Sequence, residues 1–259
     1  MKSMSLEYIC TAVIFCGGKA TRLRPILRGA PKALIKLNEQ PYLDGLLKLL
    51  FRMGVRFVFL CISPPTIIIA NSVGDGHRYG LTVKYTIDNG EVENAGALWN
   101  ALPDLHTPLL LCINGDTIVD LNLPNLINAH IRSGAVATLV GSTRNNQPHP
   151  GAIEVSLDGW VNDMHEAAQD RGEQVIVAPS SARLSNSGVY VFDRTEIKNN
   201  WKPEHRTGKM EQGLLPYLAS KRLLWAYNNG NRFLLDLGEP ERLEEALLNL
   251  QRISGFFPG

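Results

Sequence analysis

Short apolar runs along this chain alternate with longer segments whose apolar residues recur at helical spacing. The apolar runs predict buried strands at Ala12–Cys16, Arg56–Ile62, Thr82–Ile87, Leu109–Ile113 and Ala135–Val140. Helices are predicted at Tyr42–Met53, Pro65–Val73, Asn94–Leu102 and Pro124–Ser133. Strands that alternate with helices in this way favour βαβ crossovers and a mainly parallel sheet.

The pattern changes after Gly141. Two alternating segments, Gly151–Ser156 and Trp160–Glu166, flank Leu157-Asp158-Gly159, and an Asp-Gly pair in that setting predicts a β-hairpin. Polar residues dominate Gln169–Ser181, which we expect to form a mobile loop. Further strands are predicted at Gly188–Phe192, Leu223–Tyr227 and Phe233–Asp236, and further helices at Glu211–Ala219 and Glu239–Gln251.

These elements predict one doubly wound α/β domain over residues 9–251. Its first half, 9–141, is Rossmann-like with a mainly parallel sheet, and its second half, 142–251, holds a smaller antiparallel portion. Ligands of such sheets bind at the carboxyl ends of the strands. Residues at the carboxyl end of a strand or directly after it, such as Asp236 and Gly17, are therefore the first candidates for a site.

Composition narrows the function classes. The 259 residues carry a formal net charge of +1, which argues against a nucleic-acid or membrane partner, so phosphate chemistry would depend on local charge. No apolar run approaches the roughly 18 to 20 residues of a membrane span. The four cysteines lie in apolar runs and form no C-x-x-C pair, so we expect buried thiols in the reducing cytoplasm.

A glycine-rich, cationic segment follows the first predicted strand. It runs Gly17-Gly18-Lys19-Ala20-Thr21-Arg22-Leu23-Arg24-Pro25 and continues at Pro31-Lys32-Ala33-Leu34. Glycines let a backbone approach a polyanion closely and turn N–H groups toward it. Arg22, Arg24 and Lys32 bring positive charge to the same place. The segment therefore has the outline of a triphosphate site.

Two well-known phosphate loops do not fit this segment. The dinucleotide fingerprint needs three glycines spaced G-x-G-x-x-G, and they are not supplied here. The Walker loop needs Gly-Lys-Ser/Thr, but Gly18-Lys19 is followed by Ala20. A surface turn with scattered basic residues is the remaining structural interpretation.

The segment resembles the G-G-x-G-T-R-L-R-P and P-K-P signature of the sugar-1-phosphate nucleotidylyltransferases. These enzymes join a nucleoside triphosphate to a sugar 1-phosphate and release pyrophosphate. The resemblance extends from Thr11 to Leu250. Further matching segments are Gly74-Asp75-Gly76, Tyr79-Gly80-Leu81, Asn94-Ala95-Gly96-Ala97-Leu98, Asn114-Gly115-Asp116, Gly151, Glu166, Asn186-Ser187-Gly188-Val189-Tyr190 and Asp236-Leu237-Gly238-Glu239-Pro240-Glu241.

Two carboxylates at strand ends, Asp116 and Asp236, are the candidate metal ligands. Each alone could be a turn residue or a helix cap. Together they are what Mg²⁺ needs when phosphate oxygens and waters supply the other ligands. Both also fall in the motifs that resemble the family's metal motifs, so we expect Mg²⁺ as the cofactor.

The resemblance also implies roles for the cations. Arg22 would steady the departing pyrophosphate, and Lys32 would contact the α-phosphate and the sugar phosphate, so these two join Asp116 and Asp236 as the expected catalytic residues. Lys32 could instead be a solvated loop lysine, and Arg24 could pair with a surface carboxylate. Nucleotide contacts, largely through backbone groups, are expected from Cys16, Gly17, Gly18, Thr21, Gly96 and Asn114.

The resemblance is weaker in the sugar-phosphate site. The expected sugar-phosphate residues are Gly151, Glu166, Arg183 and Asn186. The family's E-K-P motif is replaced by Glu166-Ala167-Ala168, which lacks the lysine that meets the sugar phosphate. Arg183 is the favoured substitute and Lys209 the other candidate, although both could be solvated loop cations. Glu93-Asn94 also stands where Gly-Thr is commoner.

In length and motif wording the chain is most similar to the D-glycero-D-manno-heptose-1-phosphate guanylyltransferases. GTP and that heptose 1-phosphate are therefore the expected partners. A hexose-1-phosphate nucleotidylyltransferase that uses another triphosphate, and a catalytically weak nucleotide-sugar sensor, remain alternatives. A metal-dependent glycosyltransferase would not need the Gly17–Pro25 loop. The oligomeric state, including a homo-oligomer, is left open.

Overall fold

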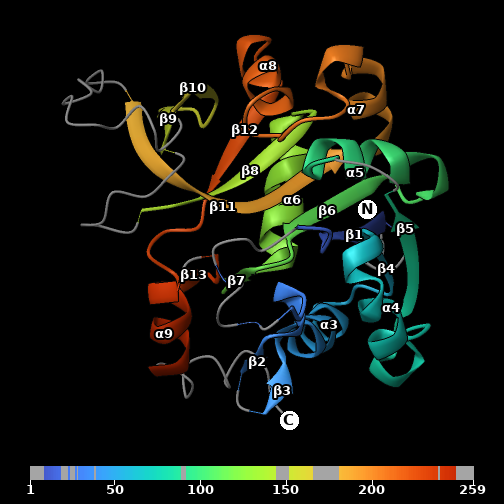
Figure 1. Ribbon diagram of the computed structural model, residues 1–259. Coiled ribbons are helices and arrows are strands. Elements are labelled where there is room, and N and C mark those ends of the chain that lie inside the picture. Colours follow the sequence, from blue (N-terminus) through green and yellow to red (C-terminus); the bar gives the residue numbers. More distant parts are fainter. Residues whose placement is uncertain are drawn as a thin grey trace.

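A mixed β-sheet runs through the molecule and has helices on both faces (Figure 1). In the part of the chain that is described it has nine strands. The computed structural model describes residues 9–18, 23, 27, 29–37, 39–88, 92–143, 152–165, 181–238 and 240–248.

The first half supplies the parallel part of the sheet. Four strands lie in the order β6 (Leu109–Asn114), β1 (Cys10–Phe15), β4 (Phe57–Ile62) and β5 (Thr82–Ile87), all parallel. In the central strand β1, residues Cys10 to Ile14 are buried, as expected for a strand covered on both faces.

The second half supplies mainly antiparallel strands. The long strand β11 (Ser181–Asp193) pairs antiparallel with β6 and also with β8 (Ala137–Ser142) and β9 (Ala152–Ser156). Strand β12 (Leu224–Asn228) runs parallel to β8. Strand β10 (Val161–His165) pairs antiparallel with β9, which confirms the predicted hairpin.

Side chains alternate between two hydrophobic cores, one on each face. Ile14 points into one core, where helices α3 (Tyr42–Arg52), α4 (Ile68–Val73), α6 (Leu123–Ser133) and α9 (Pro240–Leu248) pack. Its neighbour Val13 points into the other core, which is covered by α5 (Asn94–Ala101), α7 (Arg194–Asn200) and α8 (Leu214–Ser220). Figure 1 shows α7 and α8 above the sheet and α3 and α9 below it. This arrangement confirms the doubly wound fold class.

Short elements complete the described chain. The single-turn 3₁₀ helices are η2 (Lys32–Leu34), η3 (Pro64–Thr66), η4 (His77–Tyr79), η5 (Leu102–Asp104) and η6 (Pro203–His205). Two small ribbons pair antiparallel, namely β2 (Lys36–Leu37) with β3 (Gln40–Pro41), and β7 (Thr117–Val119) with β13 (Leu234–Asp236).

Most predicted elements are present, with shifted ends. The largest difference concerns Gly188–Phe192, because strand β11 begins at Ser181, the last residue of the predicted loop. The helix predicted from Glu211 begins at Leu214, after Gly213. The predicted helix Pro65–Val73 is divided between η3 and α4. The remainder of the predicted loop lies outside the described residues, and the single domain over residues 9–251 stays a prediction.

Two further features of the described residues can be compared with the sequence. All four cysteines are buried free thiols, as the sequence predicts. None of the described helices combines the length and the apolar character needed to span a membrane.

One buried histidine makes the stability of the fold sensitive to acid. His130 on α6 is 3% exposed, and its Nδ1 lies 2.8 Å from the Thr138 hydroxyl of β8. Burial lowers the pKa of His130 to about 4, although the charge of Asp193 acts in the opposite direction. The unfolded chain therefore binds a proton at this position at a higher pH than the native protein does.

We expect His130 to contribute to acid unfolding between about pH 6.5 and pH 4. Its neutral form is compatible with the fold above that window, and about 2 to 3 kcal/mol of stability is lost as the pH falls through it. In urea unfolding at several pH values, His130→Asn should lose less stability across the window than the wild type. The exposed His77→Asn is the control, and parallel profiles for His130→Asn and the wild type would contradict the expectation.

Candidate active site

The candidate site lies at the carboxyl end of the parallel strands, where β1 ends in a turn that is bound to both neighbouring strands. Cys16 N donates a hydrogen bond to Cys61 O at 2.8 Å, and Gly115 N donates to Phe15 O at 3.0 Å. The Ser63 hydroxyl donates to Gly17 O at 2.9 Å. These bonds place the beginning of the predicted triphosphate loop at the centre of this edge.

Gly115 is required by the close approach of two strand ends. A Cβ at this position would lie 2.4 Å from Phe15 O. Any side chain would therefore push apart the β1 and β6 ends that carry Gly17 and Asp116.

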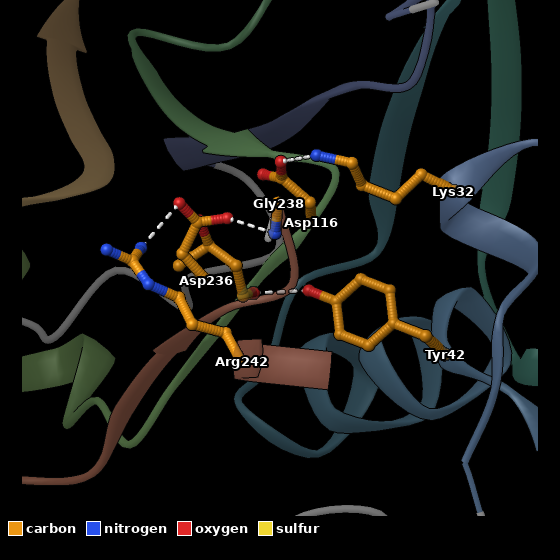
Figure 2. A network of polar contacts seen from close by, with 7 residues as sticks. Lys32, Tyr42, Asp116, Asp236, Gly238 and Arg242 are labelled. Carbon is orange, nitrogen blue, oxygen red and sulfur yellow. Dashed lines mark hydrogen bonds and ion pairs between the residues drawn. The ribbon is translucent and has the colours of Figure 1, made fainter. Parts of the chain in front are cut away.

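Lys32 and Asp116 form an ion pair at this edge (Figure 2). Lys32 begins the 3₁₀ turn η2, and its Nζ contacts Asp116 Oδ2. Both side chains are largely but not fully buried. The sequence-predicted cation and one predicted metal ligand are therefore in direct contact.

Asp236 lies beside this pair because β13 pairs with β7. Asp236 is opposite Thr117 in the register, and Leu237 N donates to Asp116 O at 2.8 Å. Asp236 Oδ1 accepts a hydrogen bond from Gly238 N at 2.7 Å, as Figure 2 shows. A Cβ on Gly238 would lie 2.8 Å from Asp236 Oδ1 and 3.3 Å from Lys32 Nζ, so the glycine keeps the two groups close.

Two further side chains support the carboxylates. Arg242 on α9 donates from Nη1 to Asp236 Oδ2 at 3.0 Å, and Tyr42 on α3 donates its hydroxyl proton to Thr117 O (Figure 2). Sequence reasoning missed both. The sequence signal for Arg242 is its distance along the chain from Asp236. Arg242 lies on the first turn of α9, and a residue there can reach back to the end of the preceding strand.

The carboxylates repel one another. Burial and the charge of Asp116 raise the pKa of Asp236, while Gly238 N–H, Lys32 and Arg242 act in the opposite direction. The cations of the site therefore do not fully compensate the two negative charges.

A hard divalent cation would compensate the excess negative charge of Asp116 and Asp236. Asp116 directly precedes β7 and Asp236 ends the adjacent strand β13, so both offer carboxylate oxygens. Mg²⁺ typically binds one or two carboxylates together with phosphate oxygens and waters. Among the described residues no group of three or more His, Cys, Asp or Glu side chains gathers into a metal cluster. The site therefore fits a metal that the substrate helps to coordinate.

Asn114, Gly96 and Gly18 are the other expected nucleotide residues that the structure describes. Asn114 ends β6 and contacts Gly188, where a Cβ would lie 2.7 Å from Asn114 Nδ2. Gly96 on α5 is buried, and a Cβ there would lie 3.1 Å from Arg206 O, so the neighbour it approaches in this structure is its own chain. Gly18 is exposed, whereas Thr21 and Arg22 lie outside the described residues.

The expected sugar-phosphate residues are only partly described. Gly151, Glu166 and Ala167, the residue that replaces the family lysine, lie outside the described residues. Arg183 is exposed on β11, opposite Glu154 of β9 in the register, and Lys209 Nζ lies 4.0 Å from Glu93 Oε1 at the surface. The β11 bulge between Asn186 and Tyr190 carries the Gly188 that contacts Asn114.

Sequence reasoning also missed Asp88, a buried carboxylate that directly follows β5. Its backbone N donates to Ile62 O at 3.0 Å, and the Ile62 backbone borders Gly17. Its Oδ1 accepts from Asn100 Nδ2 at 2.8 Å, and burial raises the pKa of Asp88 although that bond lowers it. Its position after a strand, the same signal that identified Asp116, could have revealed it.

Comparison with known proteins agrees with this geometry. Residues 11–252 match the nucleotidyl transferase family, and the chain belongs to that family. It is 30% identical over 238 residues to D-glycero-alpha-D-manno-heptose 1-phosphate guanylyltransferase of Campylobacter jejuni, a match that covers 92% of this chain and 99% of the relative. It is 26% identical over 244 residues to mannose-1-phosphate guanylyltransferase of Mycobacterium tuberculosis, covering 93% and 64%.

The fold has a solved counterpart in HddC from Yersinia pseudotuberculosis. That structure superposes with a TM-score of 0.76 at 24% identity and covers 94% of this chain and 99% of its own. The chain spans only 60 to 64% of the length of several curated relatives, among them the mycobacterial one. The resemblance to the sugar-1-phosphate nucleotidylyltransferases that the motifs indicate is confirmed.

Asp236→Asn tests the charge imbalance of the site without any turnover. The amide removes a carboxylate whose raised pKa marks it as unfavourable at neutral pH, so the metal-free variant should melt about 1 to 3 °C higher than the wild type at pH 8. Solvent screens the half-exposed side chain, which keeps the rise small. The variant should also lose the stabilisation that Mg²⁺ and a non-hydrolysable triphosphate give the wild type.

Asp120→Asn serves as the control for this melting experiment. Asp120 Oδ1 lies 3.6 Å from Arg232 Nη1 in an exposed ion pair near the end of β7, so its loss should change little. A lower melting temperature for metal-free Asp236→Asn would show that the carboxylate is stabilising and would contradict the assignment.

Proposed function

We propose that this protein transfers a nucleoside monophosphate from a nucleoside triphosphate to a sugar 1-phosphate and releases pyrophosphate. GTP is the proposed triphosphate, and D-glycero-D-manno-heptose 1-phosphate is the proposed acceptor. The observation that carries the proposal is that the β7–β13 ribbon sets Asp236 near Asp116, which is paired with Lys32 at the carboxyl end of the sheet. Family membership supports the same reaction class.

The reaction needs positioning and charge neutralisation more than covalent help. An oxygen of the sugar phosphate attacks the α-phosphorus, the bond between that phosphorus and the bridging oxygen breaks, and pyrophosphate leaves. Asp116 and Asp236 would hold Mg²⁺, which supplies the positive charge that lets two anionic substrates approach. Lys32 Nζ lies at the same carboxylates and offers an ammonium group to the α-phosphate. Arg22 remains the predicted partner of the pyrophosphate.

A guanine base is supported by the chemistry of Asp88. An ionised carboxylate accepts hydrogen bonds and donates none. The Watson–Crick edge of guanine presents two N–H donors, N1–H and N2–H, which such a carboxylate can accept. The backbone of Asp88 is hydrogen-bonded to Ile62, and the Ile62 backbone borders Gly17, so Asp88 lies near the turn that follows β1. The names of the Campylobacter and mycobacterial relatives also point to guanylyl transfer.

The sugar is supported less directly. The relative that matches this chain over nearly its whole length is named for a heptose phosphate, whereas the mycobacterial one is named for mannose 1-phosphate. A hexose phosphate with another triphosphate is the alternative substrate pair. The absence of the family lysine at Ala167 favours a second candidate function, a weakly active nucleotide-sugar sensor. The buried free thiols support the cytoplasm as the proposed compartment.

A substrate panel tests the proposed function. GTP, UTP, dTTP and CTP are each combined with heptose, mannose and glucose 1-phosphates in Mg²⁺, and pyrophosphate release is measured. GTP with the heptose phosphate should give the highest kcat/KM. Asp116→Asn should lose at least about 100-fold in kcat because the two phosphates are no longer neutralised together, whereas Asp120→Asn should retain normal rates.

Three results of the panel would revise the proposal. Near-normal rates for Asp116→Asn at saturating Mg²⁺ would remove Asp116 from the catalytic residues. Nucleotide binding without pyrophosphate release from any pair would favour the sensor. Preference for a hexose phosphate or another triphosphate would leave the reaction class intact and replace the substrates.

Asp88→Asn tests whether Asp88 recognises the guanine base of the triphosphate. The amide offers one acceptor where the carboxylate offers two, so a charge-assisted hydrogen bond to guanine is lost, worth about 1.5 to 3 kcal/mol. We expect KM for GTP to rise about 10- to 100-fold, while KM for the sugar phosphate stays unchanged. Asp104→Asn, an exposed carboxylate on η5, is the control. An unchanged KM for GTP in Asp88→Asn would move base recognition elsewhere.

A further inference from the structure

Four side chains from the two halves of the chain form a continuous hydrogen-bonded network that does not include Asp116 or Asp236. Asn186 Nδ2 donates to Tyr190 Oη at 3.0 Å, and Tyr190 Oη donates to Glu211 Oε1 at 2.7 Å. Asn94 Nδ2 completes the network by contacting Glu211 Oε1 at 3.3 Å and Oε2 at 3.2 Å. The network therefore joins the start of α5 to the bulge of β11.

The chemistry of these groups fixes the direction of every bond. An ionised Glu211 can only accept, so the single hydroxyl proton of Tyr190 goes to it and the Tyr190 oxygen accepts from Asn186. Asn186 Oδ1 accepts from Gly188 N at 3.0 Å, which excludes a flipped amide. The orientation of the Asn186 amide is therefore determined, and its second Nδ2 hydrogen lies outside the network.

The centre of the network is rigid. Tyr190 is fully buried, and its backbone pairs with Cys112 on one side and Leu139 on the other. Burial and the neighbouring Glu211 charge raise the pKa of Tyr190 well above its usual value, so the phenol remains a donor. A fixed donor on a central strand holds Asn186 at a defined position.

The same segment clamps the start of α5. Met210 N donates to Asn94 Oδ1 at 2.8 Å, Ala95 N donates to Gly208 O at 3.2 Å, and Glu93 N donates to Thr207 O at 3.2 Å. Glu211 therefore contacts the helix of the first half that carries the expected nucleotide residue Gly96 and, through Tyr190, the expected sugar-phosphate residue Asn186 of the second half.

We propose that Tyr190 and Glu211 are positioning residues for substrate specificity. Tyr190 aims the Asn186 amide at a hydroxyl of the sugar ring, and Glu211 couples that amide to the start of α5. The inference rests on the proposed function, because the sugar 1-phosphate is the ligand assigned to Asn186. The inference assigns the two residues different effects. Tyr190 affects binding of the sugar 1-phosphate only, whereas Glu211 affects binding of both the sugar 1-phosphate and the triphosphate.

Two single variants separate these effects in steady-state kinetics. Tyr190→Phe removes the acceptor of Asn186 and should raise KM for the sugar 1-phosphate about tenfold, with KM for the triphosphate within about twofold of the wild type. Glu211→Gln keeps the shape of the side chain. When its oxygen accepts from Tyr190, however, its amide nitrogen faces the amide nitrogen of Asn94, so both KM values should rise.

A double variant provides the rescue. In Asn94→Asp with Glu211→Gln, the carboxylate at position 94 accepts from the new amide and still accepts from Met210 N. Both KM values should return to within about twofold of the wild type. A role limited to stability would lower the melting temperature of the single variants without this paired loss and recovery of KM.

Tyr79→Phe is the matched control, because Tyr79 is also a buried tyrosine and its hydroxyl donates to Asp44 Oδ1 at 2.7 Å, outside the network. It should change neither KM. If Tyr190→Phe does not fold, the single variant Glu211→Gln and the double variant Asn94→Asp with Glu211→Gln test the proposal. Wild-type turnover with unchanged KM values in Glu211→Gln, or without rescue in the double variant, would overturn this inference alone. Absence of wild-type turnover with every substrate pair would overturn the proposed function and this inference together.

Discussion

The candidate site depends on the pairing of two short strands, β7 and β13. Their register sets Asp236 opposite Thr117 and lets Leu237 N donate to Asp116 O, so residues from distant parts of the sequence become neighbours. A further backbone bond, from Asp120 N to Phe233 O, continues the ladder at its other end. Without this ribbon, the Asp236 carboxylate would have no fixed position beside the loop that follows β6 and carries Asp116.

Bringing two carboxylates together has an electrostatic cost, and the surrounding structure limits it. Lys32 pairs with Asp116, Arg242 pairs with Asp236, and Gly238 N–H binds the remaining oxygen of Asp236. The pKa of Asp236 is nevertheless raised, so the site retains a demand for positive charge. A site built in this way favours a metal together with its anionic ligand, as nucleotidyl transfer requires.

The sequence was sufficient for the architecture and, with the exception of Asp88, for the candidate residues at the ends of strands. Buried parallel strands are continuous apolar runs, so β5 was predicted with its observed bounds and β1, β4 and β6 within about two residues. Asp116 and Lys32 were predicted because short motifs set them directly beside a strand end and a glycine-rich loop. These signals are local, and the backbone alone determines where such residues lie.

The contacts that sequence reasoning missed are not local. Arg242 reaches Asp236 across a helix turn, and Tyr42 supports Thr117 from another layer of the fold. Glu211 meets Tyr190 and Asn94 only because three separate elements pack together. The length of β11 was also missed, since a bulge between Asn186 and Tyr190 interrupts the alternation that marks a strand.

The central claim is that Asp116 and Asp236 form one metal site completed by the triphosphate. Electron paramagnetic resonance of Mn²⁺, titrated into the protein with and without a non-hydrolysable GTP analogue, tests it most directly. The account predicts tight binding of one Mn²⁺ only with the analogue present, weakened at least about tenfold by either Asp116→Asn or Asp236→Asn. Tight Mn²⁺ binding that persists in both variants would contradict it.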